Sequence, residues 1–159
     1  MNSNYFKKIC GRYATGIAVL TITHKSENYG ITINSFSSVS LHPPLVLFCI
    51  DKKTHFNTPF KKEKHLAINI LSESQQEISN RFANSALTNK ERFKGLNVLT
   101  EFNQPVFADT LGVLIAKLKA THDGGDHWIY IAEVSSGQVF DGSPLIYYSG
   151  SYSNLNLIE

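Results

Sequence analysis

Six short polar residues lie close together in the segment GITINSFSSVSLHPPLVLFCI, which runs from Gly30 to Ile50. They are Thr32, Asn34, Ser35, Ser37, Ser38 and Ser40. Short hydroxyl and amide side chains, with nearby backbone amides, can hydrogen-bond the polar edge of a flat ring without filling the space that the ring needs. The segment is therefore typical of a platform for an isoalloxazine ring. A serine-rich edge strand that leads into a core strand is the alternative, and residue types alone favour it.

Two prolines, Pro43 and Pro44, follow the polar residues. Proline has a fixed φ and no backbone N–H, so it suits the start of a strand better than its middle. We therefore expect Leu45–Ile50 to form a buried strand next to the polar segment.

The composition indicates one globular domain over residues 1–159, long enough to bury about two thirds of its unfolded surface. Hydrophobic residues make up 42% of the chain, and no segment approaches the roughly 20 apolar residues of a membrane helix. A net charge of +2 with dispersed basic residues gives no case for nucleic acid. Cys10 and Cys49 form no CxxC motif and no signal-peptide pattern is present, so we expect a cytoplasmic protein.

Periodic patterns divide the chain into elements. Helical spacing predicts an N-terminal helix over Tyr5–Tyr13 that covers the core, and Ser74 with Glu77 forms an SxxE capping box for a helix that ends near Phe82. The predicted strands are Ile17–Thr23, Ile31–Val39, Leu45–Ile50, Leu66–Leu71, Leu111–Thr121, Trp128–Val139 and Leu145–Tyr148.

The connections between these elements indicate antiparallel pairing. The sequence KSENYG predicts a turn between the first two strands, and HDGGDH, His122 to His127, predicts a hairpin because glycine accepts positive φ. Residues 84–110 are less periodic and predict a surface excursion that could reach a partner subunit. The expected fold is mainly β: a small antiparallel barrel, which removes exposed sheet edges, with peripheral helices.

Several common catalytic patterns are missing. No GxGxxG motif occurs, and GRYATGIA, Gly11 to Ala18, lacks the Lys and Ser/Thr of a phosphate-binding loop. The histidines form no HxH or HxxxH pair, and no GxSxG motif is present. A Rossmann fold, metal catalysis and serine hydrolysis are therefore unsupported.

The order of the remaining motifs resembles a known family. The motifs are TGIAVLT (Thr15–Thr21), GITINSFSSVSLHPPLV, HLAINIL (His65–Leu71), RFA (Arg81–Ala83), GDHWIYIAEV and PLIYYSGSY. Together they resemble the flavin reductase-like FMN-binding split-barrel family, over nearly the whole chain. The resemblance implies a six-stranded antiparallel split barrel with Greek-key-like connections, a homodimer, and flavin bound near the subunit interface.

The resemblance also implies which residues line or approach the flavin. These are Thr32, Asn34, Ser35, Ser37, Ser38, Val39, Ser40, Cys49, Lys53, Thr54, Phe82, Ala83 and Tyr152. Lys53 and Thr54 match the region near the flavin phosphate, which an ammonium and a hydroxyl suit, although a solvated lysine run is an equal alternative. A lone Cys49 is more typical of packing than of redox catalysis, and a terminal Phe82 on a helix is most often core.

His127 is the candidate catalytic residue, because in this family the histidine of a GDH segment projects toward the nicotinamide site. Without the family pattern a single histidine in a hairpin turn is usually a solvated loop residue. Asp126 is expected to shape the turn or to orient His127. Tyr147 and Tyr148 are rivals of Tyr152 for the active-site tyrosine.

The function implied is an NAD(P)H-dependent flavin reductase that passes a hydride to FMN, with FAD possible, and supplies reduced flavin to a partner monooxygenase. Two alternatives stay open: a flavin-binding or electron-transfer module without catalysis, and a reductase of another acceptor. The sequence does not decide between NADH and NADPH, between flavin as substrate and as prosthetic group, or which oxygenase is the partner. The expected ligands are flavin and NAD(P)H, with no metal, membrane or nucleic acid.

Overall fold

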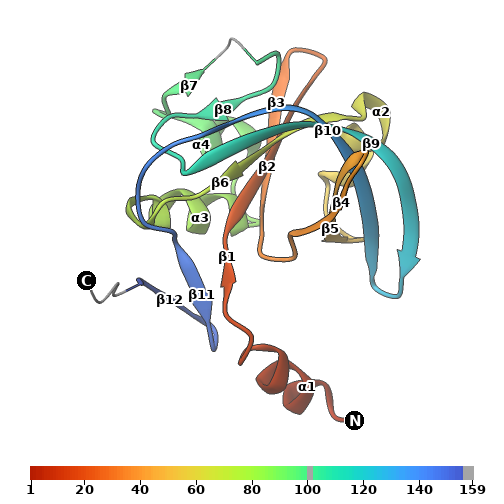
Figure 1. Cartoon of the computed structure of the whole chain (residues 1–159), viewed down its shortest axis with the longest axis vertical. Helices are drawn as coiled ribbons and strands as arrows, with labels where there is room; N and C mark the ends of the chain where they lie inside the picture. Colours follow the sequence, from red (N-terminus) through yellow and green to blue (C-terminus); the bar gives the residue numbers. More distant parts are fainter. Residues whose placement is uncertain (100–101, 156–159) are drawn as a thin grey trace.

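A computed structural model describes residues 1–99 and 102–155 (Figure 1). The helical elements are α1 (Ser3–Cys10), α2 (Asn57–Glu63), the 3-10 turn η1 (Glu73–Gln75), α3 (Gln76–Ala83) and α4 (Asn89–Phe93). The strands are β1 (Thr15–Gly16), β2 (Ala18–His24), β3 (Glu27–Ile33), β4 (Ser37–Leu41), β5 (Pro44–Asp51), β6 (His65–Ile70), β7 (Val98–Leu99), β8 (Val106–Phe107), β9 (Gly112–Gly124), β10 (His127–Val139), β11 (Ile146–Tyr148) and β12 (Ser151–Ser153).

The main sheet is antiparallel, in the order β3-β2-β6-β9-β10-β5-β4. The predicted mainly β, antiparallel fold is therefore confirmed. The sheet has seven strands where a six-stranded barrel was expected, and among residues 1–99 and 102–155 its edge strands β3 and β4 are not hydrogen-bonded to each other. The long strands β9 and β10 bend around the molecule (Figure 1).

Buried side chains fill the space that the main sheet encloses, although the edge strands β3 and β4 are not paired with each other. One buried cluster draws on six strands of the main sheet and on α2. Its large members include Ile33 of β3 and Phe48 of β5, which lie far apart in the strand order. Phe60 of α2 packs against Phe48 and Tyr130, with ring centroids 6.0 and 5.0 Å apart. Since residues from opposite ends of the sheet share one core, the sheet is curled around it.

Residues 84–99 and 102–110 pack against β2 and β3, where the sequence predicts a surface excursion. The segment contains α4, β7 and β8, and it buries Val106 and Phe107. Phe82 lies between Phe93 and Phe107, with ring centroids 5.0 and 5.2 Å apart. These rings form a second apolar cluster, which the mixed periodicity of the segment concealed.

The connections β2–β3, β3–β4 and β9–β10 differ in how closely they match the sequence prediction. The turn before β3 consists of Lys25 and Ser26, both at positive φ, so the last four residues of KSENYG already belong to the strand. The predicted strand over Ile31–Val39 is interrupted between β3 and β4. The hairpin between β9 and β10 is confirmed, and Gly125 in its turn has a φ of 81°.

The helices also differ from expectation. The capping box is formed by Ser72 and Gln75, where the sequence predicts Ser74 and Glu77, because the Gln75 side chain accepts from the Ser72 amide at 3.0 Å. Helix α2, in the lysine-rich segment around Pro59, was not predicted. Helix α1 is present but covers no core: none of its residues is buried, and it lies at the lower end of Figure 1. No helix in the described part of the chain is long and apolar enough to cross a membrane.

A buried hydrogen-bonded chain links the core to the loop after β5. The hydroxyl of Tyr130, which is fully buried, donates to Oδ1 of Asn57 at 2.8 Å. The Asn57 amide donates in turn to the Asp51 carbonyl at 2.8 Å. Burial raises the pKa of Tyr130 to about 12. The neutral phenol therefore braces the 51–57 segment from inside.

Replacing Tyr130 by phenylalanine is expected to cost about 1–3 kcal/mol of unfolding free energy at neutral pH, because Asn57 Oδ1 loses its buried donor. An unfolded tyrosine ionises near pH 10 and the folded Tyr130 near 12, so its contribution is fully present below pH 10 and is lost as the pH rises through 12. In urea titrations, the advantage of the parent over Tyr130→Phe should shrink across this window. A constant advantage from pH 9 to 12 would contradict the assignment.

Candidate functional site

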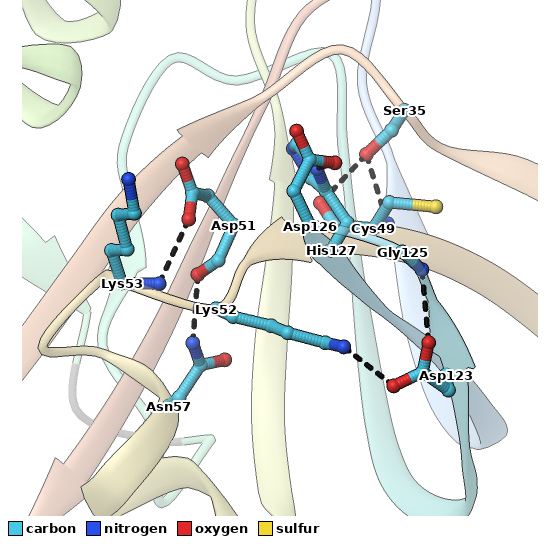
Figure 2. A network of polar contacts seen from close by, with 10 residues as sticks. All are labelled: Ser35, Cys49, Asp51, Lys52, Lys53, Asn57, Asp123, Gly125, Asp126 and His127. Atoms are coloured by element: carbon cyan, nitrogen blue, oxygen red, sulfur yellow. Dashed lines mark hydrogen bonds and ion pairs between the residues drawn. The ribbon is translucent and has the colours of Figure 1, made fainter.

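The register between β5 and β10 brings distant segments together. Asp51 pairs with His127, and Cys49 pairs with Ile129. Ser35 then ties the segment between β3 and β4 to β5, because its hydroxyl donates to the Cys49 carbonyl at 3.0 Å and accepts from the Cys49 amide at 2.9 Å. Residues from three parts of the chain therefore meet at one place (Figure 2).

A cleft of about 460 Å³ opens there, and we call it the His127 cleft. It is lined by Ile31, Thr32, Ile33, Asn34, Ser35, Cys49, Ile50, Asp51, Gly124, His127 and Ile129. Five residues predicted from the sequence are thus brought together: Thr32, Asn34, Ser35, Cys49 and His127. Isoleucine side chains supply apolar walls, and short polar groups supply an edge that can hydrogen-bond.

A second cleft, of about 520 Å³, shares Asp51 with the first, and we call it the Lys53 cleft. It is lined by Glu27, Tyr29, Gly30, Asp51, Lys53, Thr54, His55, Phe56, Ser85, Leu87, Thr88, Asn89 and Arg92. The predicted pair Lys53 and Thr54 lies here, beside the cleft that holds the other candidates.

Arg92 is a lining residue that sequence reasoning missed. Its guanidinium donates to the carbonyls of Gly30 and Asn84, each at 2.9 Å, while its buried Nε has no partner among the described residues. Burial lowers the pKa of Arg92 from its usual value, although the group stays cationic at neutral pH. No local signal distinguishes it from the neighbouring Lys90 and Lys94.

His127 stands at the start of β10 with 43% of its side chain exposed. Its Nδ1 lies 2.7 Å from Oδ1 of Asp126. The hydrogen bond from His127 and its charge lower the pKa of the Asp126 carboxyl. Among the described residues Nε2 makes no hydrogen bond. Asp126 therefore orients one ring nitrogen and leaves the other for a ligand.

The two thiols of the chain are free, and they differ in exposure. Cys10 is exposed, whereas Cys49 is half-buried in the His127 cleft. Burial raises the pKa of the Cys49 thiol, so it stays protonated at neutral pH and is a poor nucleophile. No group of His, Cys, Asp or Glu in the described ranges is arranged to hold a metal ion.

Several predicted residues lie outside both clefts. Ser37, Ser38 and Val39 are exposed on the edge strand β4, and Ser40 is half-buried there. Ala83 is exposed at the end of α3.

Phe82 and Tyr152 lie beside the clefts without lining them. Phe82 is 1% exposed and packs behind Gly30, where an added Cβ would lie 2.4 Å from its ring. The position of Phe82 is therefore that of a core residue. Tyr152 reaches the site indirectly: its hydroxyl is 2.8 Å from Ser79 Oγ, and the Ser79 carbonyl accepts from Thr32 at 2.7 Å.

The amino-acid sequence is similar to those of reductases over most of its length. A 35% identical relative from Agrobacterium fabrum, the FMN reductase (NADH) SmoA, aligns over 98% of this chain and 87% of its own length. The reductase component of a 4-nitrophenol 4-monooxygenase/4-nitrocatechol 2-monooxygenase from Rhodococcus opacus is 32% identical over 94% of this chain and 79% of its own.

A solved structure is similar over nearly the whole fold. It is the Streptomyces globisporus NADH:FAD oxidoreductase SgcE6, in complex with NAD and FAD fragments, which is 26% identical and superposes with a TM-score of 0.91 over 98% of this chain and 94% of its own. The model of the flavin reductase like domain matches residues 10–156. On the sequence match and the shared fold, the chain belongs to the flavin reductase-like domain family.

Proposed function

We propose that this protein is an NAD(P)H-dependent flavin reductase that transfers a hydride from the nicotinamide to FMN or FAD. The observation that carries the proposal is the His127 cleft, where the β5–β10 register and the Ser35–Cys49 hydrogen bonds bring His127 and the polar segment Thr32–Ser35 together. The relatives named as NADH-dependent flavin reductases support the same activity.

The residues of the His127 cleft fit an isoalloxazine ring. Ile31 and Ile129, which are half-buried, offer apolar surface to the faces of a flat ring. Fewer side-chain groups are free to hydrogen-bond the ring than the sequence indicates. The hydroxyl of Thr32 already donates to the Ser79 carbonyl, and the hydroxyl of Ser35 donates to the Cys49 carbonyl. Backbone groups and the exposed Asn34 are therefore the groups that would bind the pyrimidine edge.

The Lys53 cleft suits the phosphate end of the flavin. Lys53 and Arg92 are cations, and Thr54 adds a hydroxyl, a set that matches the charge and acceptors of a phosphate. The Lys53 amide donates to Asp51 Oδ1 at 2.8 Å, which fixes the loop between the clefts. A flavin with its ring in the His127 cleft would place its ribityl chain past Asp51.

Bound flavin supplies the redox chemistry by accepting a hydride, so no side chain has to donate a proton first. The contribution of the protein is orientation and exclusion of water. His127, with Nδ1 held by Asp126, can hydrogen-bond or stack on the nicotinamide through the rest of its ring. Cys49, protonated and half-buried, contributes packing.

The proposed activity is tested by NADH consumption with purified protein, followed by the loss of NADH absorbance. Added FMN should give turnover that saturates with flavin, and parallel runs with FAD and NADPH rank the acceptors and donors. Absence of turnover with every pair would refute the proposal. A yellow but inactive protein would instead identify a flavin-binding module.

His127→Ala should lower kcat/KM for NADH by about 10- to 100-fold, because the nicotinamide loses an orienting contact. Flavin affinity, measured by fluorescence quenching, should change less than about twofold. His122→Ala is the matched control, because His122 is exposed on the same hairpin but outside the His127 cleft. Loss of flavin binding without loss of NADH-dependent rate would overturn the role of His127.

We further propose that a partner monooxygenase consumes the reduced flavin, since relatives are named as reductase components of such enzymes. The two free cysteines agree with the expected cytoplasmic location.

The proposed assembly is a homodimer of this one-domain chain. Tyr5, Phe6 and Ile9 of α1 are 62%, 55% and 50% exposed, and this apolar face is suited to a second copy.

Phe6→Asp should convert the dimer to a monomer, because a charge is placed on the apolar face of α1. Sedimentation velocity at matched protein concentration measures the change. Asn4→Asp adds the same charge to an exposed residue of α1 outside the apolar trio and should leave the dimer intact. A parent protein that sediments as a monomer would exclude the proposed assembly.

A further inference from the structure

Lys52 contacts the turn that carries His127 at two points. Its Nζ lies 2.5 Å from Oδ2 of Asp123, and its backbone amide donates to the Asp126 carbonyl at 3.0 Å. The other oxygen of Asp123 accepts from the Gly125 amide at 3.0 Å. Figure 2 shows the Lys52 side chain extended across to Asp123. The turn is therefore tied to the loop after β5 by both main chain and side chain.

The Lys52 side chain also makes a cation–π contact with an aromatic ring. Its Nζ lies 4.5 Å from the centroid of Trp128, which packs against the main core. Only 29% of the Lys52 side chain is exposed, compared with 67% for Asp123. An ammonium that contacts a fixed ring and a carboxylate at once has less freedom than a typical surface lysine.

The backbone of His127 is paired with Asp51 and Gly124, but its side chain has no comparable anchor within residues 1–99 and 102–155. The partner of Nδ1 is the Asp126 carboxylate, which accepts its hydrogen bond and whose side chain is 89% exposed. Glycines at 124 and 125 precede it, and Gly125 sits at positive φ with nothing within 4 Å of an added Cβ. A short turn of this kind, with an exposed partner, needs an outside contact to hold one geometry.

We propose that Lys52 is a positioning residue for His127: through Asp123 and Trp128 it holds the β9–β10 turn so that the imidazole faces the His127 cleft. This inference rests on the proposed function, because the turn matters only if His127 orients the nicotinamide. Lys52 itself lines neither cleft. Its effect on the reaction therefore passes through His127.

The hairpin offers a matched control. Lys119 on β9 and Glu133 on β10 form another ion pair, at 2.6 Å, within the same two strands and away from the turn. Lys119→Met and Lys52→Met remove the same charge and keep a similar stem. Only Lys52→Met should disturb the turn.

The kinetic test compares these variants under NADH with saturating flavin. Lys52→Met should lower kcat/KM for NADH by about 3- to 30-fold, with flavin affinity and the urea midpoint close to the parent. Lys52→Arg should recover most of the loss, because it keeps a cation beside Asp123. In a His127→Ala background, Lys52→Met should have less than about a twofold effect. A full effect in that background, or an equal effect of Lys119→Met, would overturn the proposal.

A second readout does not depend on activity. The imidazole Cε1–H signal of His127, recorded by NMR on the parent, Lys52→Met and Lys119→Met proteins, should shift or broaden only in Lys52→Met. An unchanged signal would refute positioning by Lys52, and so would a changed signal with unchanged kcat/KM in an active enzyme. If the parent oxidises no NADH, the proposed function fails, while the NMR signal still decides whether Lys52 holds His127.

Discussion

The antiparallel register between β5 and β10 is the constraint on which the site depends. Side chains alternate along each strand, so Phe48 and Tyr130 face the core while Cys49 and His127 face the cleft. A shift of one residue would send His127 inward and a core ring outward. The buried aromatic cluster of Phe48, Phe60 and Tyr130 resists that shift, because a slip of one residue would expose one of its rings.

Several polar groups in and beside the clefts are occupied in building them. Thr32 bonds to α3, Ser35 bonds to β5, and Asn57 joins the buried Tyr130 to the loop after β5. A half-buried hydroxyl that already has a partner costs little to bury and contributes shape more than affinity. Of the six short polar residues that resemble a binding platform in the sequence, Thr32 and Ser35 therefore act as supports for backbone groups.

The sequence predicted the main-sheet strands, except that it joined β3 and β4 into one, together with the β9–β10 hairpin and five residues of the His127 cleft, because apolar runs and glycine turns are local signals. It did not predict the short strands β7 and β8. It missed helix α2, although Phe56 and Phe60 are spaced for one helix face, because the surrounding lysines masked them. It could not separate Phe82 as core from Phe82 as ligand contact, since both need an apolar ring at the end of α3. The Lys52–Asp123 contact joins residues 71 positions apart, which no local pattern reveals.

Two neighbouring clefts that share Asp51 suit a reaction that needs alignment more than acid–base catalysis. Hydride transfer between two flat rings requires them to stack at a fixed distance, and a small displacement costs rate steeply. The fold fixes the loop after β5 by three contacts. Tyr130 holds it from the core through Asn57, the Asp51 carboxylate accepts from the Lys53 amide, and the Asp126 carbonyl of the hairpin turn accepts from the Lys52 amide. The rigidity of one loop thus sets the relative geometry of both clefts, and in the proposed binding mode it would set the placement of the flavin ring and phosphate.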